Sequence, residues 1–408
     1  ALTIEMMQEH GHLTLDAPIS KYLPDLKLQA PLSADSITLR LLLSHTHGIA
    51  NNGPVVWRTA FSGVHNDADL LRWMALQKPS GSGRNYNYTN IGYNLAGLIV
   101  DRVAHGTWKA VMQTEVLEPL KMKRTSPYVS KFDSTDLAMP YIAEATGYTR
   151  AHYSKSDGSM HAAGGLVTTA NDISRWLRVQ INNGKIDGKQ VFPARVIEET
   201  HRKAVDQKPR GGEFVETGYG LGWALGTYHG QNVITHGGGF SSFVTMIAFQ
   251  PEQKVGVAVM VNESKIGSGV LQIVTEYVLD RGNEMPDIEK KYEGKLTQLA
   301  DQIQKRRAGI GQDRARRALR PQQLAVPLTA FVGDYDNDLG GRMNVRVVGD
   351  RIWLQIGTLK SITEVFDATS NKLRAELEPG TGEVISFDVA DGKAQALVYQ
   401  GMKFERVH

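Results

Sequence analysis

The sequence predicts a mixed α/β protein in which helices flank an antiparallel sheet and a small antiparallel β-barrel follows. Three observations indicate this. Apolar residues recur at helical spacing through the first half of the chain. From about residue 219 they form alternating, strand-length runs that end in one more helical segment. From residue 326 only short alternating runs separated by Gly and Asp turns remain. Helices followed by consecutive strands are typical of an antiparallel sheet packed against helices.

Helical periodicity is found over residues 1–10, 38–43 and 91–105, and in two segments that follow Thr107 and Thr169. Threonine is a preferred N-cap because its hydroxyl accepts a hydrogen bond from a free backbone amide of the first turn. The segment 1–10 has no such residue in front of it, and its apolar pattern resembles the last turns of a helix. We therefore expect a helix that ends near Gly11.

The strands of the predicted sheet begin after these helices. Residues 218–236 predict two strands joined at His229 and Gly230, and residues 243–262 predict a hairpin that turns at the PEQK sequence. Residues 269–280 then predict a closing helix.

The chain divides into three parts by composition. We expect a main domain over residues 1–285, a charged helical linker over 286–322 and a strand-only domain over 323–408. Close spacing of Gly and Asp turns favours a small barrel for the last part. Its expected inward positions are Met343, Val345, Val347, Ile352, Leu354, Ile356, Ile385, Phe387 and Val389.

Composition excludes several classes of function. The 408 residues include no cysteine, which removes disulfides, thiol catalysis and thiolate metal sites. The net charge is +3; residues 301–320 carry seven Lys or Arg and two acids, so the rest of the chain is about −2. A nucleic-acid-binding body is therefore not expected, and the basic run indicates a solvated linker helix. No run approaches the roughly 20 apolar residues of a membrane span.

The sequence "YNYTNIGYN" suggests a first group of site residues. Tyr88 and Asn90 lie just before an expected helix, whose N-terminus supplies free amides. A phenol can exchange a proton there if a nearby cation lowers its pKa from about 10. The carboxamide of Asn90 can donate to and accept from an amide. The alternative is that Asn90 only caps the helix and Tyr88 only lines a wall.

The sequence "THGGGF" suggests a second group. His236 ends an expected strand and Gly237, Gly238 and Gly239 follow it. Glycines allow a ligand to approach the strand closely, and amides on a free edge can hold an oxyanion. The alternative is a glycine bulge beside a surface histidine.

A third motif, "SHTHG", raises a metal hypothesis through His45 and His47. A hydrolytic metal site would also need a nearby carboxylate and further ligands. The segment that follows contains no acid, so we predict no metal and no cofactor.

Five segments in order resemble one family. They are "EHGHLTLDAPISKYLPDL", "ITLRLLLSHTHGI", "YNYTNIGYNLAGLIV", "AAGGLVTTANDISRWL" and "HGGGFSSFVTMIAFQPEQKVGVAVMVN". Together they resemble the penicillin-recognising serine hydrolases of class C β-lactamase type, which include DD-peptidases, D-aminopeptidases and related esterases. The resemblance runs from Ala1 to about residue 282. It implies a β-lactamase/transpeptidase-like domain, with Tyr88 and Asn90 on the Y-x-N motif and His236 in an H-x-G version of K-T-G.

The resemblance also implies a Ser-x-x-Lys pair that these 408 residues do not contain. In the family this pair starts the helix whose end resembles residues 1–10, which would place the lysine about four residues and the serine about seven residues before Ala1. Two interpretations stay open. The serine forms an acyl-enzyme from a segment outside this sequence, or the protein is a catalytically inactive binding protein of the same fold.

For an intact member the resemblance implies the role of each residue. The lysine and Tyr88 would share proton transfer, Asn90 would orient the lysine and the substrate amide, and His236 would supply a hydrogen bond and a pH-dependent charge. The N–H of Gly239 would contribute to the oxyanion hole. The H-x-G version is more typical of peptidase-like members, so the expected substrate is a peptide, another amide or an ester, with weak or no β-lactamase activity.

The tail from Ala330 resembles the lipocalin-like barrel fused to some of these hydrolases. That likeness is compatible with a homo-oligomer. By the family resemblance we expect a periplasmic or secreted protein.

Overall fold

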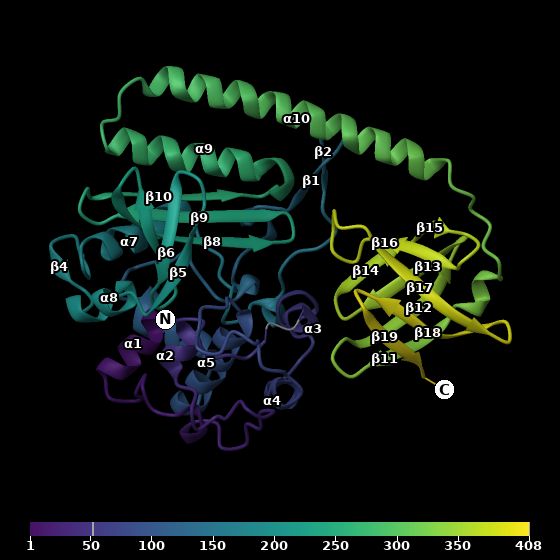
Figure 1. Cartoon of the computed structure of the whole chain (residues 1–408), viewed down its shortest axis with the longest axis horizontal. Coiled ribbons are helices and arrows are strands. Elements are labelled where there is room, and N and C mark those ends of the chain that lie inside the picture. Colours follow the sequence, from purple (N-terminus) through teal and green to yellow (C-terminus); the bar gives the residue numbers. More distant parts are fainter. Residues whose placement is uncertain (51–52, 408) are drawn as a thin grey trace.

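The computed structural model describes residues 1–50 and 53–407. Within these ranges a six-stranded antiparallel sheet lies among helices, and a nine-stranded antiparallel sheet forms a separate, barrel-like body (Figure 1). The long helix α10 (Ile288–Ala318) runs from the first body to the second. The predicted fold class is confirmed.

The six-stranded sheet has the order β10-β9-β8-β7-β6-β5. The hairpins at His229-Gly230 and at residues 251–254 are formed as predicted. Alternation did not predict the first two strands of this sheet, because Pro209 and Gly218 interrupt it. The strands are β5 (Val205–Arg210), β6 (Phe214–Tyr219), β7 (Ala224–Tyr228), β8 (Gln231–Phe240), β9 (Phe243–Gln250) and β10 (Val255–Val261).

Helices cover both faces of this sheet. Successive residues of β10 point to opposite faces of the sheet. On one face Val257 packs in a cluster with Leu279 of one helix. On the other face, a side chain added at Gly256 would contact Leu177 of a second helix. The α-helices are α1 (Leu2–Glu9), α2 (Leu39–Leu43), α3 (Gly53–Val56), α4 (Asp67–Ala75), α5 (Asn90–Ala104), α6 (Trp108–Met112), α7 (Ala170–Ile181), α8 (Ala194–His201), α9 (Ser264–Gly282) and α10.

Short 3₁₀ or π segments and two small hairpins complete this body. Thr107 and Thr169 cap α6 and α7 through their hydroxyls, as predicted. The short segments are η1 (Ile19–Lys21), η2 (Trp57–Ser62), η3 (Gln113–Leu117), η4 (Val129–Lys131), η5 (Ser134–Asp136), η6 (Asp157–Ser159) and η7 (Leu328–Ala330). The hairpin strands are β1 (Tyr141–Ala143), β2 (Tyr148–Arg150), β3 (Lys185–Ile186) and β4 (Lys189–Gln190).

The C-terminal sheet is a nearly closed antiparallel barrel in the order β14-β13-β12-β11-β19-β18-β17-β16-β15. Its interior is filled by apolar side chains. Val347, predicted to point inward, is instead exposed at the end of its strand. The strands are β11 (Gly333–Asn337), β12 (Gly341–Val348), β13 (Arg351–Ile356), β14 (Leu359–Ile362), β15 (Glu364–Asp367), β16 (Lys372–Ala375), β17 (Glu383–Ala390), β18 (Lys393–Tyr399) and β19 (Met402–Arg406).

Arginines of the basic run on α10 interact with both bodies of the same chain. Arg307 donates to the carbonyls of Glu144 and Gly147 beside the β1–β2 hairpin. Arg317 pairs with Glu364 of β15 at 2.6 Å. The helix is therefore fixed to both bodies along its length. No helix within the described residues is long and apolar enough to cross a bilayer.

An aromatic junction joins the barrel to the first body. Trp57 of η2 packs on Tyr399 of the barrel, with ring centroids 5.5 Å apart. Phe61, from the same segment, stacks on Phe240 at the end of β8, and Tyr153 packs on the other side of Phe240. The barrel is thus in contact with the end of the strand that carries His236.

Candidate functional site

Tyr88 and Asn90 lie at the N-terminus of α5, as the sequence predicts. The cap of this helix is Thr89, whose hydroxyl accepts from the amide of Gly92, so capping does not account for Asn90. Asn90 is the first helical residue and is partly exposed. The side chain of Tyr88 is 43% exposed, which leaves its phenol open to a ligand.

The loop that carries His45 positions Tyr88. The His45 ring lies against the Tyr88 ring with centroids 4.2 Å apart. Its Nδ1 accepts from the amide of Thr89 at 3.2 Å, and its backbone carbonyl accepts from Asn87. His45 adopts a φ of 59°, in the left-handed region. Sequence reasoning noted this histidine only as a metal candidate and missed its place under Tyr88.

The second histidine of the motif is engaged on both ring nitrogens. Nδ1 of His47 accepts from the amide of Ile49, so Nε2 carries the proton and donates to Thr89 at 2.9 Å. Burial lowers the pKa of His47 to about 4, which keeps it neutral. Within the part of the chain that the structure describes, no group of three or more His, Asp or Glu side chains could hold a metal ion. The geometry of His47 argues against the metal hypothesis.

His236 lies on β8 opposite Tyr88. Their ring centroids are 6.3 Å apart, although the two residues are far apart in sequence. β7 pairs with β8 only as far as Thr235, whereas β9 continues along residues 236–240. One edge of this segment is therefore unpaired within the described residues, so its backbone groups face outward for a ligand.

The three glycines of this segment differ in what surrounds them. Gly237, Gly238 and Gly239 are all exposed. A side chain at Gly238 would come within 2.4 Å of Thr245 Oγ1 on β9, so the Thr245 hydroxyl would have to move to admit it. A side chain at Gly239 would meet nothing and would project into open space. The structure thus brings Tyr88, His236 and the exposed glycine edge to one surface site.

Burial dominates the electrostatics of this site. It raises the pKa of the Tyr88 phenol and lowers the pKa of the His236 imidazole. The cation that proton transfer at Tyr88 requires is therefore not supplied by the described residues. At neutral pH His236 is therefore mainly a neutral hydrogen-bonding group, and the pH-dependent charge that the resemblance implies would develop at lower pH.

Ala1, the residue before α1, lies beside the side chains that support this site. A side chain at Gly222 would come within 3.5 Å of Ala1 Cβ and 3.0 Å of the Tyr93 hydroxyl. Tyr93 and Tyr219 both pack against the His45 ring. Ala1 therefore lies next to Gly222 and Tyr93, and Tyr93 packs on the His45 ring that contacts Tyr88.

Helices that flank an antiparallel sheet, with a phenol and an imidazole meeting beside the edge of one strand, are the arrangement expected of the serine hydrolases that include penicillin-binding proteins. The Beta-lactamase family model matches residues 1–272. The chain belongs to the β-lactamase family, and the predicted relationship is confirmed.

Relatives and solved structures agree with this family. Protein flp of Staphylococcus aureus (strain MW2) is 25% identical over 265 residues, which cover 64% of this chain and 50% of that protein. The chain thus spans about half the length of the curated relatives it matches first. The octameric penicillin-binding protein homologue of Pyrococcus abyssi is similar over 99% of this chain and 85% of its own, with 22% identity and a TM-score of 0.54.

The D-amino acid amidase of Ochrobactrum anthropi SV3 is similar over 72% of this chain and 81% of its own, with 20% identity and a TM-score of 0.53. These two structures share the fold with the chain, and the first does so over almost the whole of it.

Proposed function

We propose that the protein is a serine hydrolase that acts through an acyl-enzyme on an amide, peptide or ester, with weak or no β-lactamase activity. The observation that carries this is the approach of Tyr88 to His236, beside the open edge of β8. A phenol, an imidazole and free strand amides on one surface are the groups that an acyl transfer uses for proton transfer and for holding an oxyanion.

The nucleophile in this proposal comes from a Ser-x-x-Lys pair that precedes Ala1 in a longer chain. The position of Ala1 near Gly222 and Tyr93 supports it, because Tyr93 packs on the His45 ring that contacts Tyr88. A lysine there would also supply the cation that the buried environment of Tyr88 lacks. The serine would attack the substrate carbonyl and release the leaving group, and water would then release the acid.

The other residues have distinct roles in this proposal. Asn90 orients the lysine and the substrate amide, and the N–H of Gly239 stabilises the oxyanion together with that of the serine. His236 donates or accepts a hydrogen bond in its neutral form. The D-amino acid amidase among the similar structures supports an amide as one substrate type.

Covalent labelling tests this proposal. The chain is expressed with its natural upstream coding residues and, separately, from Ala1, and each is treated with a fluorophosphonate or a penicillin. Intact mass spectrometry should show one adduct on the longer protein and none on the shorter. A Ser-x-x-Lys sequence upstream that remains unlabelled by both reagents would contradict the proposal. Absence of the sequence upstream would support the inactive binding protein instead.

We also propose a periplasmic or secreted location and a homo-oligomer. The octameric homologue of Pyrococcus abyssi supports the second part. Light scattering on the purified protein tests it, and a monomeric mass at all concentrations would contradict it.

A further inference from the structure

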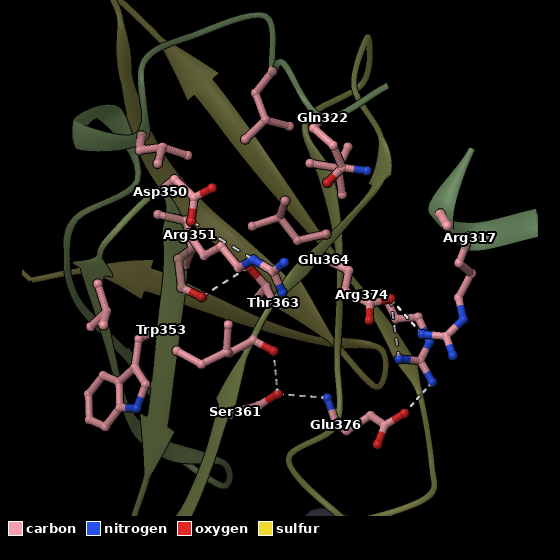
Figure 2. A pocket seen from close by; sticks show the side chains of 18 of the residues that line it. Arg317, Gln322, Asp350, Arg351, Trp353, Ser361, Thr363, Glu364, Arg374 and Glu376 are labelled. Carbon is pink, nitrogen blue, oxygen red and sulfur yellow. Dashed lines mark hydrogen bonds and ion pairs between the residues drawn. The ribbon is translucent and has the colours of Figure 1, made fainter. Parts of the chain in front are cut away.

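A second candidate site lies away from Tyr88, where the barrel meets the end of α10. A hollow of about 1300 Å³ opens there between α10, residues 322–328 and strands β13 to β16, and it also reaches His152. Figure 2 shows Arg317 of α10 on one side, facing Glu364 and Arg374 of the barrel. None of the residues of the Tyr88 site line this hollow.

The hollow follows the open seam of the barrel. β14 and β15 are the two edge strands of the nine-stranded sheet and do not pair with each other. A side-chain hydrogen bond bridges the seam instead: the hydroxyl of Ser361 on β14 accepts from the amide of Glu376, just after β16, at 2.9 Å. Behind the seam the barrel is filled by buried side chains. The available space is therefore a groove on the outside of the seam.

One wall of the groove exposes apolar side chains. Trp353 and Ile362 lie opposite each other on β13 and β14, and Ile362 is 43% exposed. Val348, at the end of β12, is 53% exposed, and Leu324 faces the same space from the linker. Apolar side chains exposed within a concave surface are typical of ligand sites.

The charges of the groove are unbalanced. Its two glutamates are already paired, Glu364 with Arg317 and Glu376 with Arg374, at 2.6 and 2.5 Å. Lys360 forms no ion pair with any residue of the described ranges, and the nearest carboxylate to Arg351 is Asp350 at 4.0 Å. Asp350 is almost fully exposed, so this contact is weak. Two cations therefore remain available on the apolar wall.

We propose that this groove binds a small organic anion with an elongated apolar body, such as a fatty acid or a short apolar peptide with a free carboxylate. Its carboxylate pairs with Lys360 or Arg351, and its apolar body lies along Val348, Trp353 and Ile362. Lys360 and Arg351 lie toward opposite ends of the β13–β14 pair, since Lys360 is opposite Gln355 on β13. The separation suits a ligand that is extended along the strands.

Isothermal titration of the 408-residue chain with sodium decanoate tests this proposal, with acetate and decyltrimethylammonium as comparison ligands. Decanoate should bind one equivalent saturably, acetate should not bind, and the cation should bind at least about tenfold more weakly. The double variant Lys360→Glu, Arg351→Glu should raise the Kd for decanoate at least about tenfold. Lys393→Glu, on β18 and outside the groove, is the matched control and should leave the Kd within about twofold.

Tryptophan fluorescence locates the bound ligand. Decanoate should shift the emission of the parent chain, and Trp353→Phe should remove most of that shift. If the double variant fails to fold by circular dichroism, Lys360→Gln replaces it, with an expected rise in Kd of about threefold. A Kd unchanged by the charge variants, equal binding of the decyl cation, or no binding of decanoate would each overturn the proposal. None of these results depends on the nucleophile of the proposed hydrolase.

Discussion

The Tyr88 site and the barrel handle ionisable groups in opposite ways. Around Tyr88, imidazoles and phenols pack against each other, and desolvation is the largest cause of the shifts in their pKa values. In the barrel, arginines pair with carboxylates on the outside of strands such as β11 and β12, and the interior is apolar. In the first region, desolvation therefore has the largest influence on the protonation of the ionisable groups, whereas in the barrel the charges are paired at the surface of an apolar core.

The largest expected effect tests whether Tyr88 is reactive. In the protein that carries the upstream segment, Tyr88→Phe should lower turnover by about 10²- to 10⁴-fold, because a positioned acid or base contributes that much. Stability should change by less than about 1 kcal/mol, since the side chain is half exposed. Steady-state hydrolysis of a chromogenic ester and thermal unfolding measure the two effects.

Tyr141→Phe is the matched control, because Tyr141 on β1 is similarly exposed and belongs to a different sheet from His236. It should retain full turnover. Turnover of Tyr88→Phe within a factor of about two of the parent would refute the role of the phenol.

The next prediction tests whether packing against the barrel supports the Tyr88 site. Trp57→Ala removes an almost fully buried ring from the junction with Tyr399, and should cost about 3 kcal/mol or more. Because the same junction contacts Phe240 at the end of β8, turnover should fall as well.

Differential scanning calorimetry should then show the two bodies unfolding separately. Leu319→Ala, on an almost fully exposed residue after α10, should leave the profile unchanged. A single unshifted transition for Trp57→Ala would show that the barrel does not support the site.

Acid should destabilise the first body more than the barrel, and the expected loss is similar in size to that of Trp57→Ala. The folded pKa of His47 is about 4 and that of His201 is also about 4, against about 6.5 in the unfolded chain. The folded state binds a proton at these two histidines less readily than the unfolded chain does. The contribution of the neutral histidines to the free energy of unfolding is therefore fully present above pH 6.5. It is lost as pH falls toward 4, on the order of 3 kcal/mol for the fully buried His47. Residues 323–407 contain no histidine.

Unfolding by urea at pH 7, 5.5 and 4 measures this difference. The first body should weaken steeply and the barrel much less over that range. His201→Gln should make the loss shallower, and His12→Gln, at an exposed position, should not change it. Equal acid sensitivity of the two bodies would contradict the comparison.

Local sequence signals predicted the frame of the first body well. The hydroxyls of Thr107 and Thr169 cap α6 and α7 through amides only a few residues away, so the local sequence is enough to predict where these helices begin. The His229-Gly230 turn is equally local, since both residues adopt positive φ. Family motifs likewise placed Tyr88 and His236 before any geometry was known.

Interactions between distant segments could not be predicted in the same way. The packing of His45 under Tyr88, and the burial that keeps His236 neutral, depend on loops and strands far apart in the chain. The groove at the barrel seam also depends on where α10 ends relative to Lys360. Val347 was predicted inward because alternation does not show where a strand leaves the barrel.

The smallest effect concerns the attachment of α10 to the barrel. Arg317 pairs with Glu364 at 2.6 Å and with Asp313, and its side chain is 15% exposed while that of Glu364 is 40% exposed. Such a partly solvated pair contributes about 1 kcal/mol or less, so Arg317→Gln should lower the midpoint of barrel unfolding only slightly.

Its neighbour Arg316 provides the control, because its side chain is 77% exposed and pairs with Asp313 at 3.6 Å. Arg316→Gln should therefore have no measurable effect. Since salt screens exposed charges, the difference between the two variants should shrink at high ionic strength. A loss above about 2 kcal/mol for Arg317→Gln would show that the barrel depends on this helix for its fold.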